Sequence, residues 1–358
     1  MKILELAPIW ETVPPPGYGG TESVVSVLTE ELVRRGHEVT LCASGDSSTS
    51  AELFAVQPYS LRPAGLADES LQYSLVHVAK ALQHADEYDI VHNHNGPPSE
   101  LGMAMSHLVR VPFLTTLHNY PSEDTRFIWS NYEGWYNTIS RRQVEVMEHL
   151  PRARFAGVAH NAIDVESFPY QAEKQDYALF MGRFAPAKAP HLAIEAAERA
   201  GIRIVLAGKV ALPEEREYFE TCIRPRLRPG RVEYAGEADA FAKRELFAGA
   251  RVLLMPLLWD EPFGLVIVEA MACGTPVIAY RRGAAPEIVV ECETGFLVDT
   301  VEDMASRVDC LDTIEPIACR YHVEQHFSPA ALADHYLRLY TRITGGGITE
   351  VHYDRVLV

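Results

Sequence analysis

The chain has 358 residues, enough for two domains, and its 47% hydrophobic content can supply two packed cores, which excludes a disordered protein. The net charge is −17 and the acid excess is shared, since residues 1–163 carry 11 basic and 19 acidic side chains and the remainder 21 and 30. Neither half therefore offers the basic face that nucleic acid or anionic lipid head groups would need, and we expect neither as a partner.

The first half begins with the order of a mononucleotide-binding unit. A short apolar strand at residues 3–7 precedes a Pro/Gly-rich loop at 13–20 and a periodic helix at 22–35. Further strands are predicted at residues 38–43, 89–92 and 111–117. Because these strands alternate with helices, they predict a parallel sheet.

The second half repeats this pattern. Its predicted strands span residues 177–182, 202–208, 232–236, 252–256 and 276–280. We therefore expect an α/β protein with two Rossmann-like, doubly wound domains that face a central cleft. Ligands of open parallel sheets bind at the carboxyl ends of the strands, so the candidate residues should meet in that cleft.

The domain boundary is predicted near residues 161–175, where Asn, Asp and Pro interrupt the periodicity. A last helix has Ser328 as its N-cap and a proline at its first position. The expected units are residues 1–165 (N-terminal domain), 166–327 (C-terminal domain), 328–345 (a helix that packs back on the first domain) and 346–358 (a tail).

Two glutamates eight residues apart, Glu261 and Glu269, flank a predicted helix start at Pro262. The amides that would form its uncapped N-terminus belong to Phe263, Gly264 and Leu265. Such an end binds phosphate, with Glu261 ahead of the helix and Glu269 two turns into it, so the pair could bracket a ligand's diphosphate. The alternative is that both are ordinary surface acids, with Glu261 in the first turn complementing the helix dipole and Glu269 a solvated helix residue.

Arg183 and Lys188 follow the first strand of the second domain, where side chains reach the cleft. An arginine can grip two phosphate oxygens while a lysine adds a mobile charge, so the two suit a diphosphate. In the first domain, Gly19 and Gly20 would let a loop approach that diphosphate closely. They lack the Gly-x-Gly-x-x-Gly spacing, so no dinucleotide cofactor is expected. Glu22 is either a first-turn acid or an acceptor contact.

His118 ends a predicted strand at the cleft edge and is either a site residue or a structural histidine. His92 and His94 alternate on another strand, but with no apparent Cys or carboxylate partner they are weak evidence for a metal, and none is expected. Trp129 and Trp135 lie in an aromatic segment that would either stack on an acceptor or pack onto the first domain.

Several ordered segments together resemble family 4 of the retaining nucleotide-sugar glycosyltransferases, which have the GT-B fold. The second-domain segments are residues 181–188, 260–270 and 273–279, and those of the first domain and hinge are 17–22, 35–41, 89–92, 116–118 and 161–164. Two positions depart from the pattern: Ala162 replaces the usual hinge glycine, and Lys209 stands where a small residue is common.

The resemblance implies roles for these residues. It assigns Arg183 and Lys188 to the donor pyrophosphate, Glu269 to the ribose hydroxyls and Glu261 to the donor sugar. His118 becomes a catalytic-site histidine, and the N-terminal domain becomes the acceptor side. The donor would be a nucleoside-diphosphate sugar used without a metal or other cofactor.

The expected function is therefore retaining transfer of a hexosyl group, from UDP- or GDP-hexose, to a hydroxyl of a soluble saccharide or small molecule. The alternatives are a nucleotide-sugar epimerase of the same fold and a non-catalytic sugar-nucleotide binding subunit. Six cysteines without a Cys-x-x-Cys pair indicate reduced thiols. Glu5 interrupts any apolar leader and no run approaches 18 apolar residues, so a cytoplasmic protein without an integral membrane segment is expected. The oligomeric state is left open.

Overall fold

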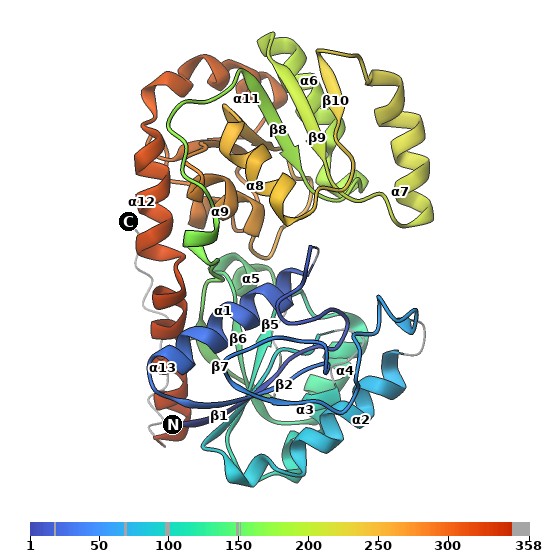
Figure 1. Cartoon of the computed structure of the whole chain (residues 1–358), viewed down its shortest axis with the longest axis vertical. Coiled ribbons are helices and arrows are strands. Elements are labelled where there is room, and N and C mark those ends of the chain that lie inside the picture. The colour runs from blue at the N-terminus through green and yellow to red at the C-terminus, as the bar shows by residue number, and fades with distance from the viewer. Residues whose placement is uncertain (18, 68–69, 97–100, 148–149, 151, 346–358) are drawn as a thin grey trace.

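The computed structural model describes residues 1–17, 19–67, 70–96, 101–147, 150 and 152–345. The expected tail at 346–358 lies outside these residues. The described chain forms two lobes, each built on a parallel sheet with helices on both faces (Figure 1). The two doubly wound sheets confirm the fold class expected from the sequence.

The N-terminal sheet has seven parallel strands in the order β3-β2-β1-β4-β5-β6-β7. The strands are β1 (Lys2–Leu6), β2 (Glu38–Cys42), β3 (Glu52–Phe54), β4 (Ile90–Asn93), β5 (Phe113–Leu117), β6 (Gly134–Thr138) and β7 (Ala153–Val158). The helices are α1 (Gly20–Arg34), α2 (Ser70–Leu82), α3 (Leu101–Met105), α4 (Glu123–Asn131) and α5 (Arg141–Val146). The sequence patterns did not predict β3, β6 or β7.

The C-terminal sheet has six parallel strands in the order β10-β9-β8-β11-β12-β13. The strands are β8 (Tyr177–Met181), β9 (Arg203–Ala207), β10 (Val232–Tyr234), β11 (Val252–Met255), β12 (Val277–Tyr280) and β13 (Gly295–Val298). The helices are α6 (Pro190–Ala200), α7 (Pro213–Tyr218), α8 (Ala240–Gly249), α9 (Leu265–Ala272), α10 (Ala285–Ile288), α11 (Val301–Arg307) and α12 (Pro316–His326). Strand β13 was not predicted.

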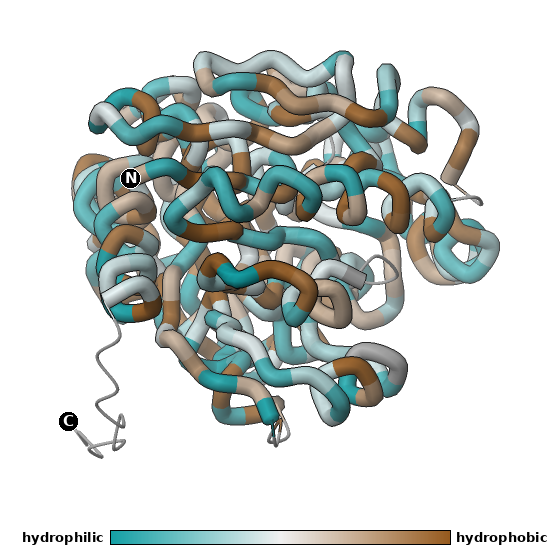
Figure 2. Tube along the Cα trace, turned by 90° about the horizontal axis from the view of Figure 1, so that it is seen from below, coloured by the Kyte–Doolittle hydropathy of each residue, from teal (hydrophilic) through white to brown (hydrophobic). Residues whose placement is uncertain are grey.

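The core of the N-terminal domain follows from the alternation of side chains along its strands. On one face of the sheet, Ile3 and Leu114 pack in a cluster with apolar residues of α1. On the other face, their neighbours Leu4 and Phe113 pack with apolar residues of α2. Both faces are apolar because a doubly wound sheet is covered on each of them. Along the outer helices hydrophilic stretches alternate with hydrophobic ones, as helices with one buried side require (Figure 2).

The last helix, α13 (Pro329–Thr344), leaves the C-terminal domain and lies against α1 and β7 of the N-terminal domain (Figure 1). Ser328 caps it by accepting a hydrogen bond from the amide of Ala331. Its buried residues Leu332, Tyr336 and Tyr340 join the cluster that contains Ile3. The chain therefore crosses between the domains twice, once in each direction.

Polar contacts also join the two domains beside the cleft. The carboxylate of Glu287, in α10, accepts hydrogen bonds from the amides of Arg141 (2.8 Å) and Arg142 (2.7 Å), which begin α5. The same carboxylate binds Nε2 of His160 at 2.9 Å. A carboxylate is favourable at a helix N-terminus because it satisfies free amides and complements the helix dipole.

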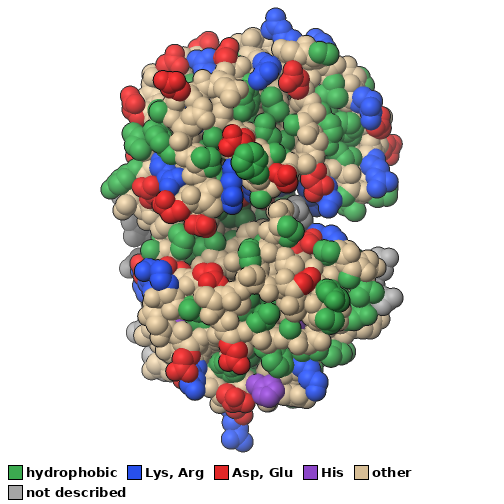
Figure 3. All heavy atoms as spheres, viewed as in Figure 1, with side chains coloured by type: hydrophobic (Ala, Val, Ile, Leu, Met, Phe, Trp, Pro, Cys, Tyr) green, Lys and Arg blue, Asp and Glu red, His purple; other side chains and the backbone are tan. Residues whose placement is uncertain are grey.

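The groove between the lobes is visible at the right of Figure 3, where acidic and basic side chains border it. The carboxyl ends of both sheets face this groove, as the cavity-lining residues below show. Among the described residues, no helix is both long and apolar enough to span a bilayer.

Candidate active site

Three adjoining cavities occupy the cleft, and Gly20 and Arg183 line all of them. We name each cavity after one acidic residue in its wall: the Glu269 cavity, the Glu261 cavity and the Glu22 cavity. Gly20 belongs to the N-terminal domain and Arg183 to the C-terminal domain. The three cavities therefore meet where the two domains approach each other.

The wall of each cavity combines loops that follow the carboxyl ends of strands. The Glu269 cavity is lined by residues of both domains, including Gly19, Gly20, Arg183, Lys209, Lys243, Leu265 and Glu269. The Glu261 cavity is lined by residues that include Gly20, His118, Arg183, Lys188, Glu261, Phe263, Gly264 and Leu265. The Glu22 cavity is lined by residues that include Trp10, Glu11, Gly19, Gly20, Glu22, Arg62, His94, His118 and Arg183.

The sheet order explains why these loops converge. In each sheet the strand order reverses once, between β1 and β4 and between β8 and β11. Loops on either side of such a reversal leave in opposite directions and open a crevice at the carboxyl ends. The Gly19–Gly20 loop and His94 flank the first crevice, and Arg183 and Glu261 flank the second.

Helix α9 begins later than the sequence predicted. Its N-cap is Gly264, whose φ of +104° is incompatible with a right-handed helix, so the first helical residue is Leu265 rather than Pro262. Glu269 consequently lies about one turn into the helix and not two. The cleft still receives the N-terminus of α9, because Gly264 and Leu265 line the Glu261 cavity.

Helix α1 presents a second N-terminus to the same place. It begins at Gly20, two residues before the predicted start, after the N-cap Gly19 with φ +148°. A Cβ atom on Gly20 would lie 3.3 Å from Cδ1 of Leu265, so this glycine allows the two helix ends to approach closely. A glycine N-cap has no side chain to satisfy the first amides of its helix, and such amides attract anions.

Each predicted charged residue of the C-terminal domain has an oppositely charged partner. Lys188 forms an ion pair with Glu261, and its Nζ also lies 5.0 Å from the ring centre of Trp259. Nζ of Lys243 lies 2.7 Å from Oε1 of Glu269. Lys243 is 26 positions from its partner and was not predicted from the sequence.

Arg183 is held by a third pair, with Glu215. Nε of Arg183 donates to Oε1 of Glu215 at 2.8 Å, and the Glu215 carboxylate is almost fully buried. The other Glu215 oxygen accepts hydrogen bonds from the amides of Ala211 (2.9 Å) and Leu212 (3.1 Å) before α7. Burial disfavours the charged form, but these amides and Arg183 outweigh it and lower the pKa of Glu215. No motif in the sequence distinguishes Glu215 from surface acids.

The alternative of ordinary surface acids does not describe Glu269, which is only 8% exposed. A buried carboxylate needs a charged or hydrogen-bonding partner, and Lys243 supplies one. Glu261 is also largely enclosed, with 17% of its side chain exposed. Lys209, whose role the sequence left open, lines the Glu269 cavity and lies 3.9 Å from Glu237.

His118 follows β5 and lines both the Glu261 and the Glu22 cavities. Its Nε2 lies 3.0 Å from Nδ1 of His94, and Nε2 of His94 lies 2.8 Å from Oε2 of Glu5. Burial, with neighbouring histidines adding to it, lowers the pKa of His118 well below 6.5 and that of His94 to about 4. Both imidazoles are therefore neutral at pH 7.

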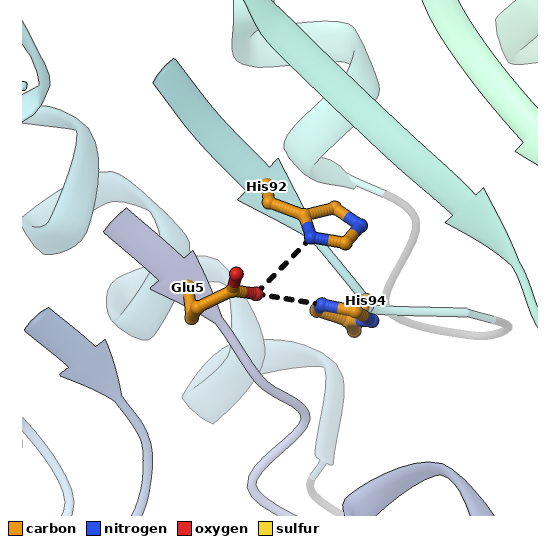
Figure 4. A group of neighbouring side chains, drawn as sticks. All are labelled: Glu5, His92 and His94. Atoms are coloured by element: carbon orange, nitrogen blue, oxygen red, sulfur yellow. Dashed lines mark hydrogen bonds and ion pairs between the residues drawn. The ribbon is translucent and has the colours of Figure 1, made fainter. Parts of the chain in front are cut away.

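The expectation that His92 and His94 have no carboxylate partner was wrong. Glu5 on β1 is paired in register with His92 on β4, and it contacts both histidines (Figure 4). One ligand atom from each of these three residues lies within 4.8 Å of the others. His92 also binds the hydroxyls of Tyr340 (2.6 Å) and Thr116 (2.7 Å), so hydrogen bonds account for the arrangement.

The Glu22 cavity contains Trp10, Glu11 and Arg62, which were not predicted from the sequence. Nη1 of Arg62 donates to Glu11 at 2.5 Å, and the guanidinium carbon lies 5.8 Å from the ring centre of Trp10. Glu22 is buried, and this burial raises its pKa to about 6. The cavity thus combines an aromatic ring, a cation and two carboxyl groups.

The two candidate tryptophans lie elsewhere. Trp129 in α4 is 1% exposed and packs in a core cluster with Met103, Leu117 and Tyr136. Trp135 on β6 is half-buried beneath the guanidinium of Arg154. As far as the described residues define the three cavities, neither tryptophan lines them. For Trp129 the structure favours the packing interpretation, because a fully packed indole cannot stack on a ligand.

Comparisons with known proteins find glycosyltransferases over both domains. A family model described as "Glycosyltransferase Family 4" matches residues 18–156, and one described as "Glycosyl transferases group 1" matches residues 163–315. An uncharacterized glycosyltransferase of Methanocaldococcus jannaschii is 27% identical, with 81% of this chain and 83% of the relative covered. The D-inositol 3-phosphate glycosyltransferase of Mycolicibacterium smegmatis is 26% identical, with 90% and 86% covered.

Among solved structures, AviGT4, a glycosyltransferase involved in avilamycin A biosynthesis, is similar over nearly its whole length. The TM-score is 0.70 at 26% identity, and the match covers 97% of this chain and 99% of that one. At 97% coverage the similarity extends over both domains, and it confirms the GT-B fold.

Proposed function

The chain belongs to the group 1 glycosyltransferases, and we propose that it transfers a hexosyl group from a nucleoside-diphosphate sugar to an acceptor hydroxyl with retention of anomeric configuration. The donor is UDP- or GDP-hexose, used without a metal ion, and the acceptor is a soluble saccharide or small molecule. The observation that carries the proposal is the meeting of three cavities at Arg183 and Gly20.

The donor would extend across two of these cavities. Its ribose hydroxyls would donate to Glu269, and its hexose hydroxyls would donate to Glu261. A buried carboxylate left without its hydroxyl partner is unfavourable, so both contacts favour sugars with hydroxyls in the right positions. The diphosphate would lie between the carboxylates, beside Arg183 and the N-termini of α1 and α9.

Catalysis would come mainly from stabilising the diphosphate as it leaves. Negative charge grows on the β-phosphate while the glycosidic bond breaks, and fixed positive groups lower the energy of that state. Arg183, Lys188 and the α9 amides supply them. To reach phosphate, Lys188 must leave Glu261, which frees that carboxylate for the sugar. The departing phosphate oxygen would take the proton of the acceptor hydroxyl on the same face, which retains the configuration.

The Glu22 cavity would hold the acceptor. It adjoins the Glu261 cavity through His118 and Arg183, which line both. Trp10 offers a ring face to a sugar, while Glu22 and Glu11 offer oxygens that bind hydroxyls. This combination supports a polyhydroxylated acceptor.

Thermal-shift screening of sugar nucleotides should identify the donor, and an acceptor screen with that donor should then reveal transfer. The coupling constant of the product's anomeric proton in its NMR spectrum reports the configuration. Arg183→Gln should abolish transfer while keeping the fold. Arg199→Gln is the matched control, because Arg199 pairs with Glu195 and Glu302 on the surface. An active Arg183 variant, or an epimerised sugar nucleotide formed without acceptor, would overturn the proposal.

A further inference from the structure

A chain of hydrogen bonds runs from the core of the N-terminal domain to the cleft. Glu5 and His94 are 0% and 1% exposed, whereas His118 lines two cavities. The link from Glu5 to His94 spans 2.8 Å and that from His94 to His118 spans 3.0 Å. The three residues come from β1, from the end of β4 and from the end of β5, which are neighbours in the sheet.

Glu5 determines which group donates and which accepts in each hydrogen bond between Glu5 and His118. Burial opposes ionisation of Glu5, but His92 and His94 outweigh it and lower the pKa of Glu5, so the carboxylate is charged. A carboxylate only accepts hydrogen bonds, so Nε2 of His94 must carry a proton and donate it. Neutral His94 then has a bare Nδ1, which can only accept.

His118 must consequently donate from its Nε2–H to His94. A neutral imidazole has one N–H, so the remaining nitrogen of His118, Nδ1, has a free lone pair. Without this chain, either tautomer would be available to a cleft histidine. A histidine held in one tautomer by a carboxylate through its second nitrogen is a recurrent way to fix what the ring offers to a ligand.

We propose that Glu5 and His94 are positioning residues that hold His118 in its Nε2–H tautomer, so that its Nδ1 accepts a hydrogen bond from a substrate hydroxyl. The hydroxyl belongs to the bound hexosyl donor or to the acceptor, and this part rests on the proposed function. His118 would then orient a hydroxyl beside the diphosphate and would not act as a cationic acid.

Glu5 has a second set of hydrogen-bonded neighbours, Tyr340 and His92, which provides an internal control. Tyr340 donates to the other oxygen of Glu5 at 3.0 Å and also binds Nδ1 of His92. The Tyr340 hydroxyl is as buried as Glu5, but it does not lie between Glu5 and His118. Tyr340→Phe should therefore lower stability and leave the tautomer of His118 unchanged.

The direct test needs no substrate. Protein with 15N-labelled histidine is examined by long-range 1H–15N correlation NMR at pH 7, and His118→Asn assigns the His118 signals among the 14 histidines. We expect neutral His118 with the proton on Nε2. A doubly protonated ring, or a proton on Nδ1, would overturn the proposal even if the protein is an active transferase.

Variants of Glu5 and His94 test whether their hydrogen bonds fix the tautomer of His118. His94→Leu removes the acceptor for His118, so the single tautomer should be lost and kcat should fall about 10- to 100-fold with a smaller change in donor KM. Glu5→Gln keeps an amide oxygen that can accept from His94 and should retain more activity than Glu5→Leu. If His94→Leu folds and keeps both the tautomer and kcat, or if Tyr340→Phe lowers kcat equally, the positioning role is wrong. If no transfer is found with any donor, the NMR spectra of the same variants still show whether Glu5 and His94 fix the tautomer of His118.

Discussion

The ion pair between Lys243 and Glu269 allows a direct test of whether Lys243 orients the Glu269 carboxylate for ligand binding. Replacing Lys243 by Met keeps the length of the side chain but removes its ammonium group. Glu269, which is 8% exposed, would then lack the cation that lies 2.7 Å from its Oε1. The carboxylate would be left buried without its charged partner.

The magnitude follows from this distance. At 2.7 Å, an effective dielectric constant of about 20 gives a gross attraction of about 6 kcal/mol between unit charges, most of which is offset by lost hydration. Removing one partner of a buried charged hydrogen bond typically costs about 1–3 kcal/mol. We therefore expect the free energy of unfolding of Lys243→Met to fall by about that amount.

Ligand binding should weaken as well. Lys243 holds one oxygen of Glu269, and Glu269 lines the cavity where the ribose hydroxyls of the donor would bind. We expect the Kd of the nucleoside diphosphate alone to rise about tenfold, which corresponds to about 1.4 kcal/mol.

Urea unfolding and isothermal titration calorimetry measure the two effects separately. Arg199→Met is the control, because Arg199 and Glu195 form an exposed pair on one helix, and such pairs contribute less than about 1 kcal/mol. A Lys243→Met protein that unfolds and binds nucleoside diphosphate as the wild type does would refute the idea that Lys243 orients Glu269.

Three further predictions follow from the packing and the charges. Trp129→Ala should lower the free energy of unfolding by about 3–5 kcal/mol, because the indole is 1% exposed. The variant that remains folded should keep the acceptor KM of the wild type. A selective increase in acceptor KM would instead show that Trp129 binds the acceptor. Glu215→Ala should destabilise the protein and raise the Kd for the nucleoside diphosphate, because Arg183 loses its fixed partner, and calorimetry showing wild-type affinity would contradict this. His77 and His94 have pKa values of about 4 in the folded state because burial disfavours their charged forms, against 6.5 when unfolded. The unfolded chain therefore binds more protons, so stability should be full above pH 6.5 and decline as the pH falls toward 4, and a urea midpoint that is constant over that range would contradict these assignments.

Much of the fold was predictable because buried parallel strands are continuous apolar runs between turn signals. The runs at residues 177–182 and 252–256 correspond to β8 and β11, for example. Strand β6 was missed because it carries Asn137 and Thr138, which are buried although polar. Both residues are buried because β6 lies between β5 and β7, and only the assembled sheet creates that position.

The start of α9 shows the limit of local rules. Pro262 is a favourable first helical residue, but two positions later the backbone adopts a φ of +104° at Gly264. The helix can begin only after that glycine. The sequence shows that Pro262 is compatible with the first turn of a helix. The backbone conformation at Gly264 in the folded protein decides that the helix starts later.

The sequence alone determined that four charged or polar side chains would reach the cleft. Arg183, Lys188, Glu261 and His118 follow the ends of predicted strands, and doubly wound topology brings such ends together. What only the tertiary structure decided is how each of them is held. Glu215 lies 32 positions from Arg183, and Glu5 lies 89 from His94. Spacing along the chain has no bearing on such pairs, because the sheet order and the burial of the acids bring them within hydrogen-bond distance.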